Sequence, residues 1–451
     1  MLGTIALAAL AASAQEDWKE QLEAEKRARE ADRQEFERRL AALEAQKSKE
    51  ALHAQVEEYL AERDLFQAEL PDATRGGLGR LIEISAILDV TVGGSTADDE
   101  ALNEINLGDH DPKVSGFNVR NEELVVSADV DPYFYAVLDV VYKISEEGES
   151  EFELEEAYAV TTGLPASLQL KVGQFFTEFG RVNPLHPHAW EFLNYPVILA
   201  RVLGPDGWRG QGARLSWIAP TGFPLMLLVG AQNARGETQA SFLGEEGGMV
   251  GAYTLMDRDV SGLGDLAWNA RVEASHDVAA WQGTLTGLVG FSLGYGPNGT
   301  GTEANTTIYG IDLYVKWRPD RTDAGWPFVA WQTEVVWRDY DAAAQTDPVV
   351  LPSTLYQDWG LYTQVVYAFR RPWTAAVRYD FADSDGAYAG AAERLSFAVS
   401  YYTSEFARIR IELNWDNVDG LGTTVPGASD RAFSFWINFD FALGKHGAHK
   451  F

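Results

Sequence analysis

Residues Arg408–Asp416 read Arg-Ile-Arg-Ile-Glu-Leu-Asn-Trp-Asp, and this stretch decides the predicted fold. Every second residue is apolar, and the residues between them are charged or carry an amide. Because alternate side chains of a strand point to opposite faces, one face here is apolar and the other strongly polar. Residues 433–441 repeat the pattern, with four phenylalanines and one isoleucine on the apolar face. A strand of this kind is typical of an all-β transmembrane antiparallel barrel, with lipid outside and water inside.

Composition agrees with a barrel and excludes several functions. The chain has 451 residues, 42 of them glycine, and is rich in Trp, Tyr and Phe. It has no cysteine, which excludes disulfides, thiolate metal sites and a cysteine nucleophile. The net charge of −31 argues against nucleic-acid binding and suggests either attraction of cations or the solubility of exposed loops.

The chain divides into four predicted parts. Residues 1–14 resemble a signal peptide, with an apolar stretch that ends in small residues before Gln15. Residues 15–70, without Gly or Pro and rich in Glu, Arg, Lys and Ala, predict a charged periplasmic α-helix, either a short coiled coil or a solvated helix. Residues 71–79 read as a linker, and residues 80–451 as the outer-membrane β-barrel.

About sixteen strands are predicted after residue 80. Short and long connections alternate between them, as expected for periplasmic turns on one rim and extracellular loops on the other. One short connection is predicted near His276–Val278. No apolar run approaches the roughly 20 residues that a membrane-spanning helix needs.

Alternation also predicts which charged side chains line the pore. They cannot face hydrocarbon, where each would cost several kcal/mol. Either they set an electric field that biases passing ions, or they pair with one another and only keep the wall wet. The predicted pore-lining residues are Arg271, Glu273, Asp312, Lys316, Arg318, Arg378, Asp380, Arg394, Arg408, Arg410 and Glu412.

The long connection at 177–206 is unusually apolar for an exposed loop. Folding into the lumen would hide its apolar side chains and narrow the pore, so we predict a constriction loop. The alternative is a loop that caps the barrel or contacts a neighbouring subunit. The residues of this loop that we predict to lie at the constriction are Arg181, His186, His188, Trp190, Glu191 and Arg201.

His186 and His188 lie in a His-Pro-His motif, with Glu191 close by. Imidazole and carboxylate groups suit Zn²⁺, but a complete site needs three or four ligands, and the sequence offers no convincing others. Hydrogen bonding within the loop is the favoured interpretation, and a metal site at His186 and His188 is the alternative. No cofactor is expected, apart from divalent cations bound weakly.

Enzyme motifs in the context that they require are absent from the sequence. It contains no His-Glu-x-x-His and no Gly-x-x-x-x-Gly-Lys, and its Gly-x-Ser-x-Gly match at residues 290–294 lies within an alternating strand pattern and not at a strand-to-helix turn. We therefore expect no catalysis.

Two neighbouring segments resemble a known family of proteins. The first, from Lys171 to Arg181, reads Lys-Val-Gly-Gln-Phe-Phe-Thr-Glu-Phe-Gly-Arg, and Asn-Pro-Leu-His-Pro-His-Ala-Trp follows shortly after it. With the signal peptide, the charged helix and the terminal Phe451, they resemble bacterial outer-membrane porins. The likeness is to phosphate-selective-type porins and to zinc-regulated porin-like outer-membrane proteins. Phosphate specificity is not implied, because the chain outside the helix is acidic.

These observations predict a passive outer-membrane channel of a Gram-negative cell for small hydrophilic solutes or ions. The expected partners are outer-membrane lipids, the solutes, two further copies in a homotrimer and, through the helix, the periplasm or peptidoglycan. Nucleic acid is not expected. Two alternatives stay open: a structural anchor or envelope tether acting through the helix, and a protein that binds or takes up a metal such as zinc.

Overall fold

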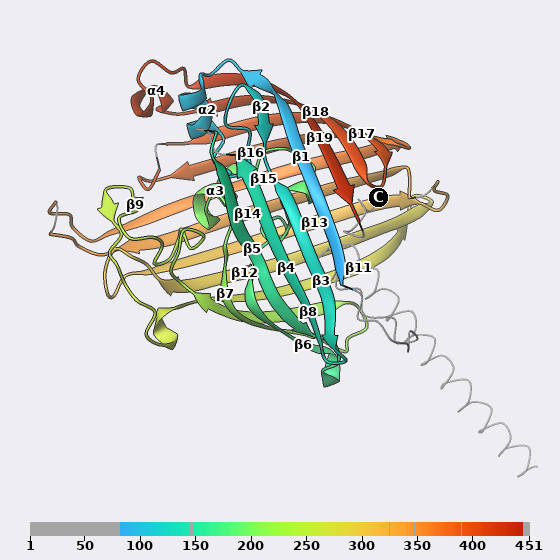
Figure 1. Cartoon of the computed structure of the whole chain (residues 1–451), viewed down its shortest axis with the longest axis horizontal. Helices are drawn as coiled ribbons and strands as arrows, with labels where there is room; N and C mark the ends of the chain where they lie inside the picture. The colour runs from blue at the N-terminus through green and yellow to red at the C-terminus, as the bar shows by residue number, and fades with distance from the viewer. Residues whose placement is uncertain (1–81, 145–147, 324, 347–348, 389, 445–451) are drawn as a thin grey trace, which may run out of the picture. The chain divides into compact units, whose positions relative to one another are not determined.

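The computed structural model describes residues 82–444, except 145–147, 324, 347–348 and 389 (Figure 1). The predicted signal peptide, periplasmic helix and linker lie outside the described residues, as does Phe451. Among the described residues, no helix is long and apolar enough to cross a membrane.

Sixteen long strands make up the main sheet, and their alternating composition is the reason that they form strands rather than helices. They are β1 (Glu83–Ser95), β3 (Glu122–Asp131), β4 (Phe134–Ile144), β5 (Ser150–Thr161), β6 (Leu168–Phe176), β7 (Arg209–Ile218), β8 (Leu225–Asn233), β11 (Leu266–Ala280), β12 (Gly283–Pro297), β13 (Asn305–Pro319), β14 (Phe328–Ala342), β15 (Thr354–Arg370), β16 (Trp373–Ser384), β17 (Ala392–Ser404), β18 (Ala407–Val418) and β19 (Arg431–Leu443).

Shorter elements lie in the connections. They are α2 (Asp99–Ile105), β2 (Gly116–Val119), η1 (Pro165–Ser167), η2 (Pro187–Ala189), α3 (Val197–Leu203), β9 (Met249–Val250), β10 (Tyr253–Thr254), η3 (Leu263–Asp265) and α4 (Leu421–Thr424).

The long strands close into a barrel. Each pairs antiparallel with the next along the chain, β8 pairs with β11, and the last strand, β19, pairs with β1. The four-residue strand β2 adds only a short pairing to β1. The prediction of an antiparallel barrel of about sixteen strands is therefore confirmed.

The two faces of each strand differ as the sequence predicts. In β18, Arg410 is 1% exposed whereas its neighbour Ile411 is 44% exposed. The register places Arg408 opposite Asp440 of β19 on the inner face, and Ile409 opposite Phe439 on the outer face. Polar side chains therefore gather inside the barrel and apolar ones outside.

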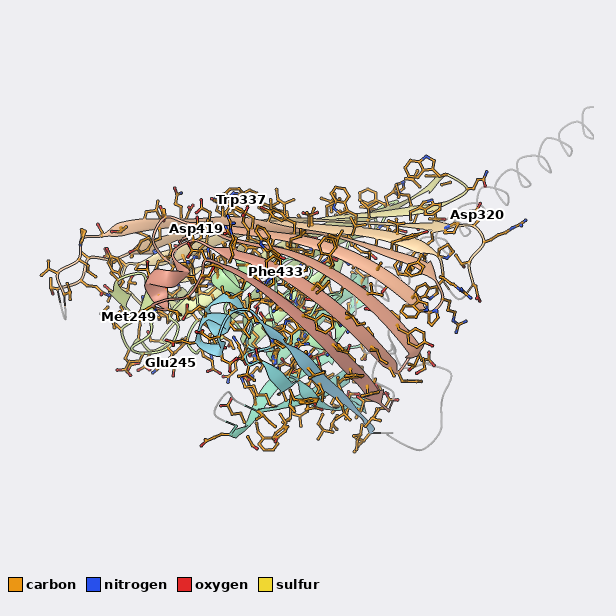
Figure 2. All side chains as sticks on the ribbon, turned by 90° about the horizontal axis from the view of Figure 1, so that it is seen from above. Glu245, Met249, Asp320, Trp337, Asp419 and Phe433 are labelled. Carbon is orange, nitrogen blue, oxygen red and sulfur yellow. The ribbon has the colours of Figure 1, made fainter. Side chains whose placement is uncertain are left out.

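Short and long connections lie at opposite ends of the barrel. In Figure 2, Asp320, from the short connection between β13 and β14, lies at one end. Glu245, Met249 and Asp419, from two of the long connections, lie toward the other. This arrangement agrees with the predicted alternation of turns and loops.

One predicted turn is wrong. The connection expected near His276–Val278 lies instead at Trp281 and Gln282, since β11 continues to Ala280. Both turn residues have positive φ, 48° and 58°. A two-residue hairpin turn of this type is usually made by Asn-Gly or Asp-Gly, so Trp-Gln gives no turn signal in the sequence.

Candidate functional site: the lumen and its inner loop

The connection between β6 and β7, residues 177–208, folds inside the barrel; we refer to it as the inner loop. All seven residues of its helix, α3, are buried. Six of them, all except Arg201, belong to one hydrophobic cluster with inward-facing residues of the wall, among them Ile308, Val336 and Tyr362. Hydrophobic burial against the wall therefore accounts for the apolar composition of this connection.

Wall side chains also hold the backbone of the inner loop. Glu334 of β14 accepts hydrogen bonds from the N–H groups of Arg181 and Val182, both at 3.0 Å. Four strands further along the sheet, Glu412 of β18 accepts one from the N–H of Leu193 at 2.8 Å. The loop is thus attached to two separate parts of the wall.

Cationic wall residues bind the carbonyl groups of the same loop. Arg408 donates to the carbonyl oxygens of His188 at 2.8 Å and Trp190 at 3.0 Å, and Arg410 also reaches Trp190. The guanidinium of Arg378 lies over the ring of Phe192, 4.8 Å from its centroid. Wall charge and loop backbone therefore form one connected network.

The inner loop contributes two cations of its own. Arg201 of α3 donates to the carbonyl oxygens of Ala382 and Gly390, at 3.3 and 2.8 Å. Arg181 lies over the ring of Tyr314, 4.3 Å from the centroid. Both predicted loop cations thus contact the wall.

The eleven charged residues predicted to line the pore lie on β11, β13, β16, β17 and β18, and all except half-buried Arg318 are buried. Most form ion pairs. The pairs are Arg271 with Glu273 and Asp312, Arg378 with Asp380, Arg394 with Asp416, and Arg408 and Arg410 with Asp440.

Several partners in this network were missing from the predicted set. Asp416 and Asp440 pair with predicted arginines, and Glu334 holds the loop. A further buried pair joins Arg338 of β14 to Asp358 of β15. The alternation already marks each of them as inward-facing, but which residues pair depends on strand register.

The histidines of the His-Pro-His motif meet acidic residues of the wall. His186 lies near Glu123 of β3, Asp139 of β4 and Glu155 of β5. His188 Nδ1 lies 2.9 Å from Glu123 Oε1. Burial alone would lower the pKa of His186, but the carboxylates of Glu155 and Glu123 raise it well above its usual value.

Glu191, the carboxylate nearest in sequence to the two histidines, is not among the acidic residues that His186 and His188 contact. It acts electrostatically on Tyr402 and Arg408. The acidic partners of the histidines therefore come from β3, β4 and β5, and the sequence spacing gave no sign of them.

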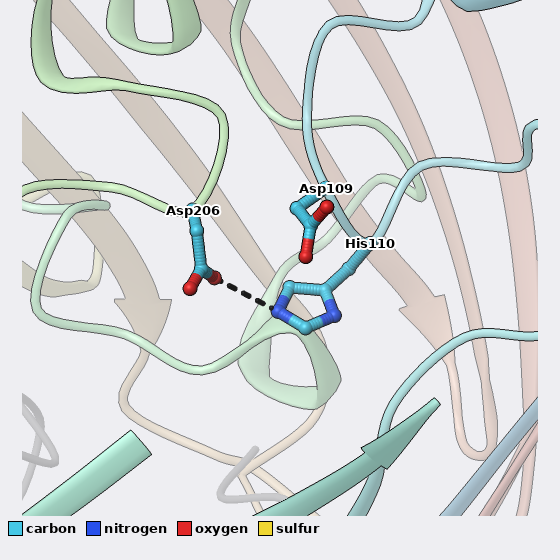
Figure 3. A group of neighbouring side chains, drawn as sticks. All are labelled: Asp109, His110 and Asp206. Carbon is cyan, nitrogen blue, oxygen red and sulfur yellow. Dashed lines mark hydrogen bonds and ion pairs between the residues drawn. The ribbon is translucent and has the colours of Figure 1, made fainter. Parts of the chain in front are cut away.

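A second acidic cluster surrounds His110, in the connection between β1 and β3 (Figure 3). His110 Nε2 lies 3.0 Å from Asp206 Oδ1, and its Nδ1 lies 3.1 Å from the carbonyl oxygen of Arg120. Burial opposes protonation, but the hydrogen bond and the charge of Asp206, with Asp109, raise the pKa of His110 to about 9. Burial would raise the pKa of Asp206, yet Arg209 and His110 lower it.

The closed barrel of sixteen antiparallel strands, with a long connection folded inside, defines the porin-like class of β-barrels. A solved structure of this class, the anion-selective porin from Comamonas acidovorans, has a TM-score of 0.50 at 10% identity and covers 81% of this chain and 100% of that one. The structure of OprB from Pseudomonas putida has a TM-score of 0.46 at 10% identity, and the match covers 81% of this chain and 94% of that one.

The chain belongs to the same family as an uncharacterized protein of Aquifex aeolicus. The two are 32% identical over 411 residues, which cover 82% of this chain and 80% of that relative. No protein-family model matches the chain.

Proposed function

We propose that this protein is an outer-membrane porin through which small hydrophilic solutes or ions diffuse passively, and that the inner loop is its constriction. One observation carries the proposal. Inside a barrel with an apolar exterior, the inner loop is bonded to the wall at two places four strands apart, through Glu334 of β14 and Glu412 of β18. A loop held in this way narrows the passage and sets the size of solute that can cross.

The net charge of −31 supports a preference for cations. The Comamonas porin is described as anion-selective, so the direction of selectivity is a point on which the two proteins would differ. We further propose a homotrimer, with the segment 15–70 in the periplasm. The finer resemblance, to phosphate-selective-type or zinc-regulated porin-like proteins, stays a prediction.

A second candidate function is a structural anchor in the outer membrane. It is favoured by the burial of the wall charges beneath the inner loop: Arg271, Asp380 and Glu412 are each at most 3% exposed. In an anchor the loop would act as a plug, and the charges would only stabilise it.

Single-channel conductance in a planar bilayer distinguishes the two functions. We would compare the wild-type protein with a variant in which a short Gly-Ser linker replaces residues 184–203. The matched control shortens the connection 419–430, which lies outside the inner loop. A salt gradient gives the sign of the ion preference.

For a porin we expect small discrete steps with cation preference, and much larger steps when the inner loop is replaced. The control should conduct like the wild type. A correctly folded barrel that stays silent before and after replacement of the loop would favour the anchor. Equal conductance of all three proteins would mean that the inner loop does not constrict the channel.

A further inference from the structure

Three acidic strands and the inner loop bring metal-binding groups together. His186 Nδ1 lies 2.8 Å from Glu155 Oε2, 3.7 Å from Glu123 Oε1 and 3.7 Å from Asp139 Oδ2. One ligand atom from each of Glu123, Glu155 and His186 lies within 4.8 Å of the other two. Two ligands at about 2.0–2.1 Å from a tetrahedral zinc would themselves be roughly 3.3 Å apart, so these separations are of the right size.

A β-bulge in β5 provides two of the carboxylates. Asp139 of β4 pairs with Glu156, and the next residue, Val140, pairs with Leu154, which leaves Glu155 as the extra residue. The bulge turns both Glu155 and Glu156 toward the interior, where both are buried. Bulges commonly re-aim a side chain beside a functional site.

The other ring nitrogen of His186 is already engaged. Nε2 lies 3.3 Å from Glu156 Oε2, and Glu156 in turn is 3.7 Å from the ammonium of Lys171. A carboxylate that accepts the Nε2 proton fixes the ring, so that release of the Nδ1 proton to solvent when the ion binds would leave the Nδ1 lone pair directed at Glu155, Glu123 and Asp139. Metal-ligating histidines are typically oriented by a carboxylate in this way.

Negative charge exceeds positive charge at this point. Four buried carboxylates meet here, whereas the permanent cations are the ammonium beside Glu156 and Arg209, 3.9 Å from Glu155; the imidazoles of His186 and His110 add positive charge only when they are protonated. Buried carboxylates need a compensating charge. Asp139 is 2% exposed, and its Oδ1 has no hydrogen-bond partner among the described residues.

We propose that Glu123, Glu155 and His186, with Asp139 beside them, bind one divalent metal ion of the zinc class. A single imidazole with carboxylates suits Zn²⁺, whereas Ca²⁺ and Mg²⁺ favour oxygen ligands alone. The bound ion would replace the Nδ1 proton of His186, add a further positive charge among the carboxylates, and join the inner loop to β3 and β5. The site needs only the folded barrel, so it does not depend on the proposed porin function.

The cluster around His110 serves as the internal comparison. Lys143 pairs closely with Asp109, and Arg209 pairs closely with Asp206. Cations of the protein therefore already neutralise both carboxylates, and this cluster is not expected to bind the ion.

The test is zinc binding by the full-length protein in detergent, after removal of metal with a chelator. All proteins carry Gln in place of His53, His446 and His449, which lie outside the described residues. Affinity is measured by competition with a chromophoric chelator, and stoichiometry by elemental analysis. The variants are His186→Gln, Glu155→Gln and Glu123→Gln. The controls are His110→Gln and His276→Gln, the latter at an exposed position of β11.

We expect one zinc ion per chain, and at least a tenfold loss of affinity in each of the three variants. His276→Gln should bind like the parent, and His110→Gln, in which the removed Nε2 lay 3.8 Å from Glu155 Oε1, should change the affinity less than any of the three ligand variants. Absence of binding by the parent, or binding that survives His186→Gln but not His110→Gln, would overturn the site.

X-ray absorption at the zinc edge of the parent protein covers the case in which the variants fail to fold. One imidazole nitrogen together with carboxylate oxygens at about 2.0–2.1 Å is expected. A spectrum with two or more imidazoles, or with none, would contradict the ligand set.

Discussion

Glu412 accepts a hydrogen bond from the backbone N–H of Leu193 at 2.8 Å, although the two residues are 219 positions apart. The Glu412 side chain is fully buried, and it joins β18 to the inner loop. A hydrogen bond to a charged group contributes about 1.5–3 kcal/mol. Glu412→Ala should therefore shift the equilibrium between attached and detached loop by roughly tenfold or more toward detachment.

This first prediction is measured as single-channel conductance, which should rise in Glu412→Ala. Glu412→Gln is the matched control, because its amide oxygen can still accept the Leu193 N–H while the charge is removed. If both variants conduct alike, the change comes from wall charge and not from release of the loop.

The second prediction concerns the buried pair of Arg338 and Asp358. Arg338 Nε donates to Asp358 Oδ2 at 2.7 Å, and its Nη1 donates to Ser241 Oγ at 3.0 Å. Removing one partner of a buried ion pair costs about 3–5 kcal/mol, because the other charge is left uncompensated. Arg338→Met should lower the free energy of unfolding by this amount in a denaturant titration.

The exposed pair of Arg371 and Asp323, 3.8 Å apart, provides the control. Arg371→Met should change the free energy of unfolding by only about 0–1 kcal/mol. Equal effects of the two changes would show that burial does not decide the contribution of an ion pair in this barrel.

The strands and the inner loop could be predicted because each depends on a local pattern. Alternation in Arg408–Asp416 is a property of neighbouring residues, and it specifies a strand with two unlike faces before any partner is known. The apolar composition of 177–206 likewise required a place away from water.

The acidic partners of His186 could not be predicted in the same way. Glu123 and Glu155 reach it because β3, β4 and β5 are neighbours in the sheet and the inner loop turns inward against them, which no spacing in the sequence encodes. The bulge at Glu155 adds a second difficulty, since it breaks the strict alternation that assigns side chains to a face. Strand register, which pairs Arg408 with Asp440, is also a property of the closed sheet.

The third prediction is a pH dependence that arises at His110. Its pKa is raised from 6.5 to about 9 in the folded protein, so folding favours the protonated form. This contribution to stability is fully present below about pH 6.5 and is lost as the pH rises through about 9. At one pKa unit per 1.36 kcal/mol, it amounts to about 3 kcal/mol at most.

The measurement is the unfolding midpoint of wild type and of His110→Gln, in buffer with a chelator, from about pH 6 to about pH 10. The wild type should lose its advantage over the variant across this interval. A difference that stays constant with pH would mean that His110 does not titrate there.

The fourth prediction concerns Gly180, where the inner loop leaves β6. Its φ is +63°, a conformation that costs other residues roughly 1–2 kcal/mol. A β-carbon at this position would clash with the carboxylate of Glu334, which holds the N–H groups of Arg181 and Val182. Gly180→Ala should therefore both strain the backbone and displace the acceptor that attaches the loop.

The measurement is hydrogen exchange of backbone amides, which should become faster at Arg181 and Val182 in Gly180→Ala, while the strands of the wall keep their protection. Gly222→Ala, in a short connection where a β-carbon would meet open space, should leave exchange unchanged. Unaltered exchange in Gly180→Ala would mean that contacts other than Glu334 hold this end of the inner loop.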